Sequence, residues 1–318
     1  IIKCDEKIEE IKAKQEADRL ERERLEKAEA ERIAKRNKKI AIITTPIVCA
    51  IIAFIIVLNT VIIPNGKYND AIALMDAGKY TEAISAFEAM DGYKDSISKI
   101  EECNINIYGE EVWNKIKKIK SVNVGDICSF GSYEQDNNKS NGQEDIEWLV
   151  LAKEGTKILV ISKYALDCQQ YNTSDADVTW ETCTLRKWLN NNFLGSAFTA
   201  DEKAMIPTVT VSADNNPDYS TNPGNATQDQ VFLLSIPEAN KYFNSDSARQ
   251  CKPTDYAVAN GAYVNSSNGN CWWWLRSPGY YQNVAACVLS DGDVDEFGSS
   301  VNRDNRAVRP ALWIDLNS

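Results

Sequence analysis

The residues whose types and spacing best suit chemistry lie in one polar and aromatic stretch near the C-terminus, Tyr280–Arg306. Two apolar segments with tryptophans enclose it, Cys271–Pro278 and Ala307–Trp313. Inside it, Tyr, Asn, Ser, Asp and Arg alternate with small residues. Tyrosine brings a large contact area at low entropic cost, and short polar side chains add adaptable hydrogen bonds, as recognition surfaces require. A solvated β-meander with Gly-Asp turns has a similar composition, so both interpretations stay open.

We call Tyr280–Arg306 the recognition stretch, and we expect its larger side chains to contact a ligand. A protein surface is favoured over a glycan as the partner because the stretch is long and mixed in character. We predict no catalytic residue, no metal ligand and no cofactor. The expected ligand-binding residues are Tyr280, Tyr281, Asn283, Val284, Leu289, Ser290, Asp293, Asp295, Glu296, Phe297, Ser299, Ser300, Asn302, Arg303, Asn305 and Arg306.

Composition argues against several other classes of function. The chain has no histidine, which removes Ser-His-Asp and Cys-His catalysis and every metal site that contains histidine. Its net charge of −11 disfavours a nucleic-acid partner, because phosphate binding needs a concentrated basic face. The nine cysteines form no C-x-x-C motif, so a zinc or thioredoxin-like site is poorly supported. Cys168 and Cys183 could pair in an oxidising exterior, or remain free buried thiols.

Other groups of charged residues carry weaker hypotheses. The acidic run Asp291–Glu296 could hold calcium through oxygen ligands, although a turn explains it equally well. Asp175, Asp177 and Glu181 could supply paired carboxylates for glycoside hydrolysis, but a solvated loop is favoured. Arg276 and Arg309 flank the recognition stretch. We expect carboxylates or carbonyls to hold each of them, because an unpaired buried charge is costly.

The elements that must position the recognition stretch are short strands and helices after Ser121. Apolar runs bounded by turn residues predict the strands, and apolar periodicity with capping residues predicts the helices. A capping box is expected where Ser235 precedes Glu238 by three residues. The predicted strands are 127–130, 147–151, 157–161, 231–234, 272–275 and 308–314, the helices are 184–192, 199–204 and one starting at 235, and the loops are 136–142 and 215–230.

The first part of the chain predicts a charged helix followed by a membrane span. Residues 1–39 carry Glu and Lys or Arg pairs four residues apart, which favours a solvated single helix over a coiled coil. Ile40–Ile63 has no charged residue and is long enough to cross a bilayer as a helix, with Pro46 near its start. The chain does not begin with Met, consistent with an upstream part outside this sequence.

The charges beside the apolar segment predict its orientation. Lys35, Arg36, Lys38 and Lys39 precede it, whereas Lys67 stands alone just after it. The positive-inside rule then places the N-terminus in the cytoplasm and the rest of the chain outside a bacterial cell.

Residues 67–120 read as a helical stalk between the membrane and the final domain. Gly78, Tyr80, Ala83 and Phe87 form G-x-Y-x-x-A-x-x-x-F, which resembles the centre of a tetratricopeptide repeat. In such a pair of helices, small and large apolar residues alternate so that the helices approach closely. One or two units favour a short stalk over a peptide-binding groove.

Motifs spread over the last two thirds of the chain carry a resemblance to a known family. From about Val124 to the end, the sequence resembles an uncharacterised extracellular domain family of gut bacteria. That family is similar in fold to formylglycine-generating enzyme, a variant of the C-type-lectin-like fold. The motifs are Val124-Gly125-Asp126, Ile146-Glu147-Trp148-Leu149-Val150, Leu185-Arg186-Lys187-Trp188-Leu189-Asn190, Trp273-Trp274-Leu275-Arg276-Ser277-Pro278-Gly279 and Ala307-Val308-Arg309-Pro310-Ala311-Leu312.

The resemblance implies an α+β fold and a possible source of variation. Some proteins of this fold are the variable proteins of diversity-generating retroelements, in which template Asn codons are altered at their adenines. Such changes can produce every expected ligand-binding residue except Glu296. They can also produce Cys287. They never give Lys, which is absent after Lys252. The similar enzyme uses two cysteines near its C-terminus, and the corresponding region here lacks such a pair.

Together these observations predict an α+β protein with four segments. These are a charged cytoplasmic helix at 1–39, a transmembrane helix at 40–63, a tetratricopeptide-like stalk at 67–120 and a C-type-lectin-like domain at 121–318. The expected function is ligand recognition at the cell surface, without catalysis. The alternatives are an envelope sensor that signals through residues 1–39, and an enzyme derived from the formylglycine-generating fold that acts through Cys271 or Cys287.

Overall fold

The computed structural model describes residues 2–316, with the side chains of residues 2–6 and 8 left undescribed. Residues 1, 317 and 318 of the predicted segments therefore lie outside the described residues. The first unit is helical, and the second combines mostly antiparallel sheets with short helices, so the fold is α+β. The chain divides between Ile107 and Tyr108 into two compact units, which are described separately.

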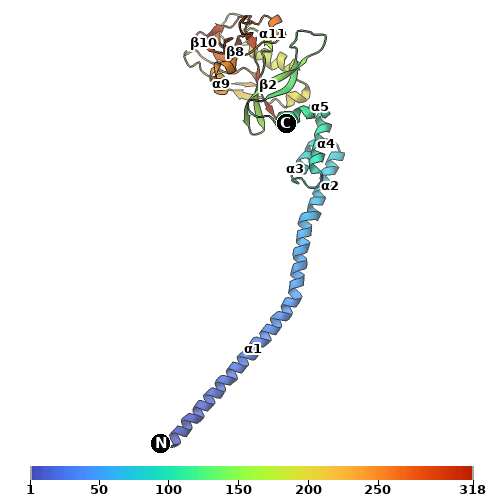
Figure 1. Ribbon diagram of the computed structural model, residues 1–318, viewed down its shortest axis with the longest axis vertical. Coiled ribbons are helices and arrows are strands. Elements are labelled where there is room, and N and C mark those ends of the chain that lie inside the picture. The colour runs from blue at the N-terminus through green and yellow to red at the C-terminus, as the bar shows by residue number, and fades with distance from the viewer. Residues whose placement is uncertain (1, 317–318) are drawn as a thin grey trace. The chain divides into compact units, whose positions relative to one another are not determined.

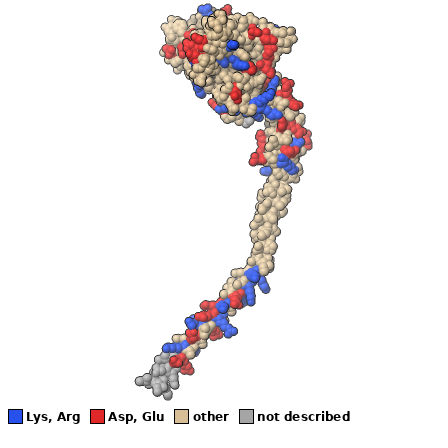
Figure 2. All heavy atoms as spheres, in the orientation of Figure 1, with Lys and Arg blue, Asp and Glu red and all other residues tan. Residues whose placement is uncertain are grey.

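One continuous helix dominates the first unit (Figure 1). Helix α1 (Ile2–Val57) passes into a π-helical turn η1 (Leu58–Ile62) and then into α2 (Ile63–Asp76). The predicted charged and apolar helices are therefore parts of a single helix. Its uncharged section, about residues 40–63, is long and apolar enough to cross a membrane and appears as a band without coloured charges in Figure 2.

The position of Pro46 differs from the prediction. We expected it near the start of a helix, where the missing N–H is tolerated, but it lies deep inside α1. The carbonyl four residues before it therefore lacks the usual intrahelical donor.

Two further helices complete the first unit. Helix α3 (Tyr80–Glu88) packs against α2, and α4 (Ser96–Tyr108) follows. Ala71, Ala83, Phe87 and Cys103 form their buried cluster, so the predicted close approach at Ala83 and Phe87 is confirmed. The α2–α3 turn contains Gly78 at φ +72°, a conformation that side chains disfavour.

The second unit begins with helix α5 (Glu110–Lys120) and contains two five-stranded sheets. The first sheet has the order β1-β2-β3-β12-β7, with every neighbouring pair antiparallel. Its strands are β1 (Ile127–Tyr133), β2 (Glu144–Glu154), β3 (Lys157–Ser162), β7 (Val231–Phe232) and β12 (Ala311–Asp315). The four strands predicted within 127–161 and 231–234 and the 136–142 loop are therefore confirmed.

The second sheet has the order β10-β9-β8-β11-β4, with one parallel pair, β8 and β11. The predicted single strand 308–314 is wrong. Arg309 and Pro310 interrupt it, and the pieces on either side join different sheets. The strands of the second sheet are β4 (Asp167–Cys168), β8 (Trp273–Pro278), β9 (Val284–Val288), β10 (Val294–Ser300) and β11 (Ala307–Val308).

Short helices and one small hairpin surround the two sheets. Side chains satisfy the first N–H groups of α8 and α9, where the Thr199–Glu202 and Ser235–Glu238 capping boxes are both formed. The predicted loop 215–230 is wrong at its end, because β6 pairs with β5 there. The remaining elements are α6 (Thr184–Trp188), the π-helical η2 (Leu189–Phe193), α7 (Leu194–Ala197), α8 (Ala200–Ala204), α9 (Ile236–Tyr242), α10 (Asp246–Arg249), α11 (Asp255–Ala259), β5 (Val209–Val211) and β6 (Thr227–Asp229).

Three tryptophans form the centre of the core, and each indole N–H has a partner. Trp148, Trp273 and Trp274 are fully buried. Their indole groups donate to backbone carbonyls at 2.6 Å (Phe130), 3.2 Å (Arg249) and 2.9 Å (Gln169), respectively. Large apolar area is thus buried without an unpaired donor, which stabilises the fold at no polar cost.

Arg276 is the most highly bonded charged residue of the core. Its guanidinium donates to the carbonyls of Leu233 at 2.9 Å and Ser212 at 3.1 Å, and it forms ion pairs with Asp214 and Glu238. Arg309 likewise donates to the carbonyls of Ser162 and Arg249. The expectation that both arginines are tied down by carboxylates or carbonyls is confirmed.

Replacement of Arg276 should destabilise the second unit strongly. Arg276→Met removes the cation that pairs with Asp214 and Glu238 and a donor to two carbonyls, so we expect a loss of about 3–5 kcal/mol in the free energy of unfolding. Urea denaturation of the full chain in detergent measures it. The control Arg303→Met alters an exposed side chain and should change stability by less than about 0.5 kcal/mol. Equal effects of the two variants would refute the structural role of Arg276.

Candidate recognition surface

The recognition stretch is built as two strands with ordered turns. Strand β9 pairs with β8 on one side and with β10 on the other. We expected the stretch to loop between the predicted core strands 272–275 and 308–314, and this expectation is wrong. The β-meander, the other interpretation of the composition, is what forms. Because the stretch belongs to the sheet, its exposed side chains project from a hydrogen-bonded scaffold.

Four aromatic rings gather at one end of this meander, and we call them the aromatic patch: Tyr219, Tyr280, Tyr281 and Phe297. The rings of Tyr280 and Phe297 are stacked, with centroids 5.1 Å apart. Tyr219 and Tyr281 meet Tyr280 edge-on at 4.8 and 4.3 Å. Tyr280, Tyr281 and Phe297 are nevertheless 40%, 59% and 53% exposed. The patch therefore holds large apolar surface in water with its geometry already set.

Two glycines allow the backbones under the patch to come close. A Cβ atom on Gly279 would lie 2.4 Å from the carbonyl oxygen of Phe297. A Cβ atom on Gly298 would lie equally close to the carbonyl oxygen of Ala285, and Gly298 has φ +81°. This approach lets Tyr280 N–H donate to the Phe297 carbonyl at 2.9 Å, which brings the two stacked rings together.

The loop before β6 forms hydrogen bonds with the backbone at the patch. Asn216 is buried, and its amide donates to the carbonyls of Pro278 and Glu296, both at 2.8 Å. Thr221 donates to the carbonyl of Tyr280 at 3.0 Å. The patch is thus assembled from parts of the chain about 60 residues apart.

Two carboxylate residues are next in sequence to rings of the patch: Asp218 precedes Tyr219, and Glu296 precedes Phe297. Burial raises the pKa of Glu296, and the charges of Asp218, Asp293 and Asp295 raise it further. The surface beside the aromatic rings therefore carries a negative potential, which favours a partner with basic groups.

The remaining predicted ligand-binding residues lie at different depths. Asp293 and Arg303 are exposed, whereas Ser290 and Arg306 are buried. Arg306 lies over the Trp272 ring at 4.1 Å and donates to Ser299, so its side chain is used inside the fold. The intermediate positions are Asn283, Val284, Leu289, Asp295, Glu296, Ser299, Ser300, Asn302 and Asn305.

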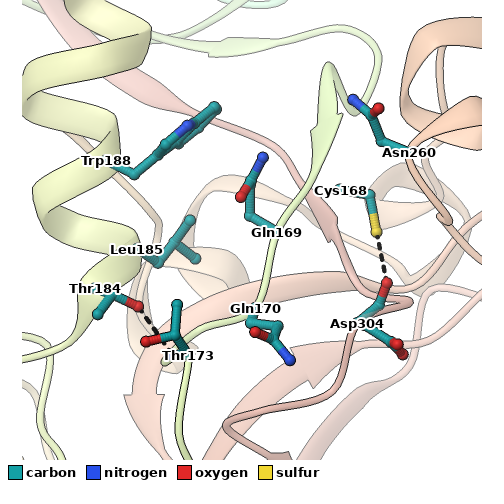
Figure 3. A pocket seen from close by; sticks show the side chains of 9 residues that line it. All are labelled: Cys168, Gln169, Gln170, Thr173, Thr184, Leu185, Trp188, Asn260 and Asp304. Atoms are coloured by element: carbon teal, nitrogen blue, oxygen red, sulfur yellow. Dashed lines mark hydrogen bonds between the residues drawn. The ribbon is translucent and has the colours of Figure 1, made fainter.

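A polar hollow of about 390 Å³ borders the C-terminal end of the recognition stretch (Figure 3). Trp188 and Leu185 line one side, with Gln169 and Gln170 next to them and Asn260 and Asp304 opposite. The Gln170 amide donates to the carbonyl of Asn302 at 2.7 Å. The hollow is lined by amide, carboxylate, hydroxyl and thiol groups, the last from Cys168.

Sequence reasoning missed Tyr219, Asn216 and the residues of the hollow. Asn216 and Tyr219 fall in the predicted loop 215–230, and the contacts that join them to the patch are with residues distant in sequence. The Trp188 position was assigned to a helix face, which is correct, but nothing in the spacing pointed to Gln169 or Asn260 across from it.

The described cysteines are free thiols, so the suggested Cys168–Cys183 bridge is not formed. Cys251 and Cys271 lie together: Cys271 N–H donates to the Cys251 carbonyl at 2.8 Å, and their thiols interact. Burial opposes ionisation of Cys251, but the hydrogen bond from Cys271 and the nearby Arg309 lower its pKa to about 7. Burial raises the pKa of Cys287 to about 11, which disfavours a nucleophilic thiolate there.

The other carboxylates proposed for chemistry do not converge. Asp175 is exposed and accepts from Asn283 at 2.9 Å, and Glu181 accepts from Asn225 at 3.0 Å. Where side chains are described, Asp291–Glu296 contributes to no group of three possible metal ligands.

The conformation at Gly298 should be essential to the aromatic patch. In Gly298→Ala, the added Cβ atom would be strained by the positive φ and would clash with the Ala285 carbonyl oxygen. We therefore expect a loss of about 1–3 kcal/mol in stability. The matched control Gly195→Ala lies in α7 with open space at its Cβ and should stabilise by up to about 1 kcal/mol. Thermal unfolding of both variants measures this difference. A neutral Gly298→Ala would contradict the described geometry.

Comparison with known proteins gives one match. A family model described as a domain of unknown function (DUF6273) matches residues 155–316, from just before β3 to just after β12. No curated protein and no solved structure matches the chain. The matched region is about half of the chain and contains the whole recognition stretch. The chain therefore belongs to the DUF6273 family.

Proposed function

We propose that this chain is a membrane-anchored recognition protein that binds a partner outside the cell through the recognition stretch. The observation that carries the proposal is the aromatic patch. Three large side chains are about half exposed, although apolar rings normally gain free energy by burial. Contiguous exposed apolar surface with polar residues around it marks interaction sites.

The energetics of the patch suit binding. Its rings already contact one another, so little side-chain entropy is lost when a partner covers them. Aromatic residues in the centre of an interface commonly provide most of the binding free energy, and polar groups around them exclude water. Asp218 and Glu296, next in sequence to Tyr219 and Phe297, are polar groups that would contribute to such a rim.

The partner favoured by this surface is a protein that presents basic side chains. The carboxylates beside the rings would pair with lysines or arginines, which also interact with aromatic faces. A glycan remains the second class of partner, because flat aromatic rings and amides suit sugars as well.

The proposed fold of the second unit is C-type-lectin-like. Two antiparallel-rich sheets with short helices and long ordered loops agree with the motifs that resemble that fold. Retroelement diversification belongs to the same proposal, restricted to exposed and half-buried positions. Changes at Cys287, Ser290 or Arg306 would disturb buried contacts, so these three are left out of the proposed ligand contacts.

The proposed orientation follows from charge. The four basic residues before the apolar section favour a cytoplasmic N-terminus, with both the stalk and the DUF6273 domain outside a bacterial cell. The continuity of α1 with η1 and α2 also favours the envelope sensor as a second function. A helix without a break could transmit a change outside the cell to the charged cytoplasmic segment.

Removing the patch should abolish binding. Surface-protein and glycan arrays probed with the full chain in detergent identify the partner. Tyr280→Ala and Phe297→Ala should each weaken the affinity for that partner at least about tenfold. Val258→Ala removes an exposed apolar side chain from α11 and should leave affinity unchanged. Binding that survives both patch variants would refute the proposal.

The orientation can be tested by thiol labelling of intact cells. Ser85→Cys and Ala17→Cys each place a thiol at an exposed helical position. A membrane-impermeant maleimide should label Ser85→Cys on intact cells and Ala17→Cys only after lysis. The unmodified chain measures background, and the reverse pattern would show that the DUF6273 domain lies in the cytoplasm.

A further inference from the structure

The hairpin between β1 and β2 gathers three carboxylates that no part of the recognition surface uses. Glu134 follows the last residue of β1, Asp136 lies in the loop, and Glu144 begins β2. One oxygen from each lies within 4.8 Å of the others. Three ionised carboxylates so close repel one another, so the arrangement favours either a shared proton, as in the hydrogen bond between Glu134 and Asp136, or a bound cation.

Glu134 gives the most direct indication of a bound cation. The residue is only 8% exposed, and its Oε1 atom is buried without a hydrogen-bond partner. Burial and the charge of Glu144 both raise the pKa of Glu134. An unpartnered buried carboxylate oxygen is costly, and native structures normally satisfy it with a donor, water or ion.

The described part of the chain shows no basic side chain paired with this cluster. Among the residues whose side chains are described, no Lys or Arg forms an ion pair with Glu134, Asp136 or Glu144. Lys139 is in the same loop, but its ammonium lies 5.9 Å from the centre of the Tyr256 ring.

The other two carboxylates are already oriented. Glu144 accepts through Oε2 from the backbone N–H groups of Gln135 at 2.7 Å and Asp136 at 3.3 Å. Asp136 accepts from the Asn138 N–H at 2.8 Å and from the Asn141 amide at 2.7 Å. These bonds fix the directions of the carboxylates before any ion arrives, which reduces the entropic cost of binding.

We propose that Glu134, Asp136 and Glu144 bind a calcium ion. All three donors are hard carboxylate oxygens, with no nitrogen or sulfur that would favour zinc or copper. Magnesium requires a strict octahedron, whereas calcium accepts variable coordination, so three carboxylates held by an irregular loop suit calcium better. Three carboxylates place the affinity in the range of extracellular modules, with Kd about 10⁻⁴–10⁻³ M.

The ion would hold a hairpin that is connected to the rest of the unit. Tyr133 donates to Asp167 at 2.6 Å, and the Gln135 carbonyl accepts from Tyr256 N–H at 3.0 Å. Tyr256 is in the first turn of α11, which ends just before Asn260 of the polar hollow. Calcium binding is therefore expected to stabilise the second unit as well as the loop.

The experiment measures unfolding of the full chain in detergent, with EDTA or with CaCl₂ up to 10 mM. At ten times Kd, calcium should raise the unfolding midpoint by about 3–5 °C. Magnesium should need at least about tenfold higher concentration. Terbium, which occupies calcium sites, should luminesce when the neighbouring Tyr133 is excited, and calcium should displace it.

Glu134→Gln is the informative variant. It keeps the shape of the side chain and removes a repelling charge, so its midpoint in EDTA should equal or exceed that of the unmodified chain. Its calcium shift and terbium signal should be lost. Asp136→Asn provides a second variant with the same expected loss.

Asp293→Asn is the matched control, because it changes a carboxylate in the other acidic run and should keep the full calcium shift. No calcium shift in the unmodified chain would overturn the proposal. So would a shift that survives Glu134→Gln, or one that is lost in Asp293→Asn.

Discussion

The buried guanidinium of Arg276 is the interaction on which the rest of the second unit depends. It joins the middle of β8 to the segment Ser212–Asp214, to the carbonyl of Leu233 just after β7, and to Glu238 in the first turn of α9. Burying a charge is unfavourable unless each of its donors is satisfied, so these parts can fold only in this arrangement. The same strand ends at Pro278, two residues before Tyr280 of the aromatic patch. The core and the recognition surface therefore share one polar anchor.

The surface is rigid for a related reason. Tyr280 and Phe297 come from neighbouring parts of a meander whose backbones nearly touch at Gly279 and Gly298, and Asn216 joins two of their carbonyls from a third segment. A partner would meet rings that are already in place. This arrangement differs from a flexible loop, which would lose conformational entropy on binding.

Local patterns in the sequence predicted the local structure well. The strands near Ile127 and Lys157 and the helix at Thr184 follow from alternation, periodicity and turn residues, and the Ser235 cap follows from one spacing. The apolar section around Ile51 is recognisable by length and lack of charge alone. The errors occur where distant contacts decide. Arg309 and Pro310 separate β11 from β12, and these strands join different sheets. The recognition stretch forms strands because β9 pairs with β8.

The candidate site was only partly predictable. Tyr280, Tyr281 and Phe297 stood out because large aromatic residues are rare in a polar stretch, and they are indeed exposed. Ser290 and Arg306 looked equally polar but are buried, because a polar side chain with internal partners has the same sequence signature as one that faces solvent. Glu134 gave no signal, since its neighbours Asp136 and Glu144 become close only when the hairpin forms.

Radical footprinting on living cells tests the central claim most directly, because it reports solvent exposure and cell side in one measurement. Short-lived hydroxyl radicals generated outside intact cells should oxidise Tyr280, Tyr281 and Phe297 and leave Trp148, Trp273 and Trp274 unmodified until the protein is unfolded. Oxidation of the patch only after lysis would place the surface inside the cell. Oxidised tryptophans beside unmodified tyrosines would contradict the fold on which the surface is built.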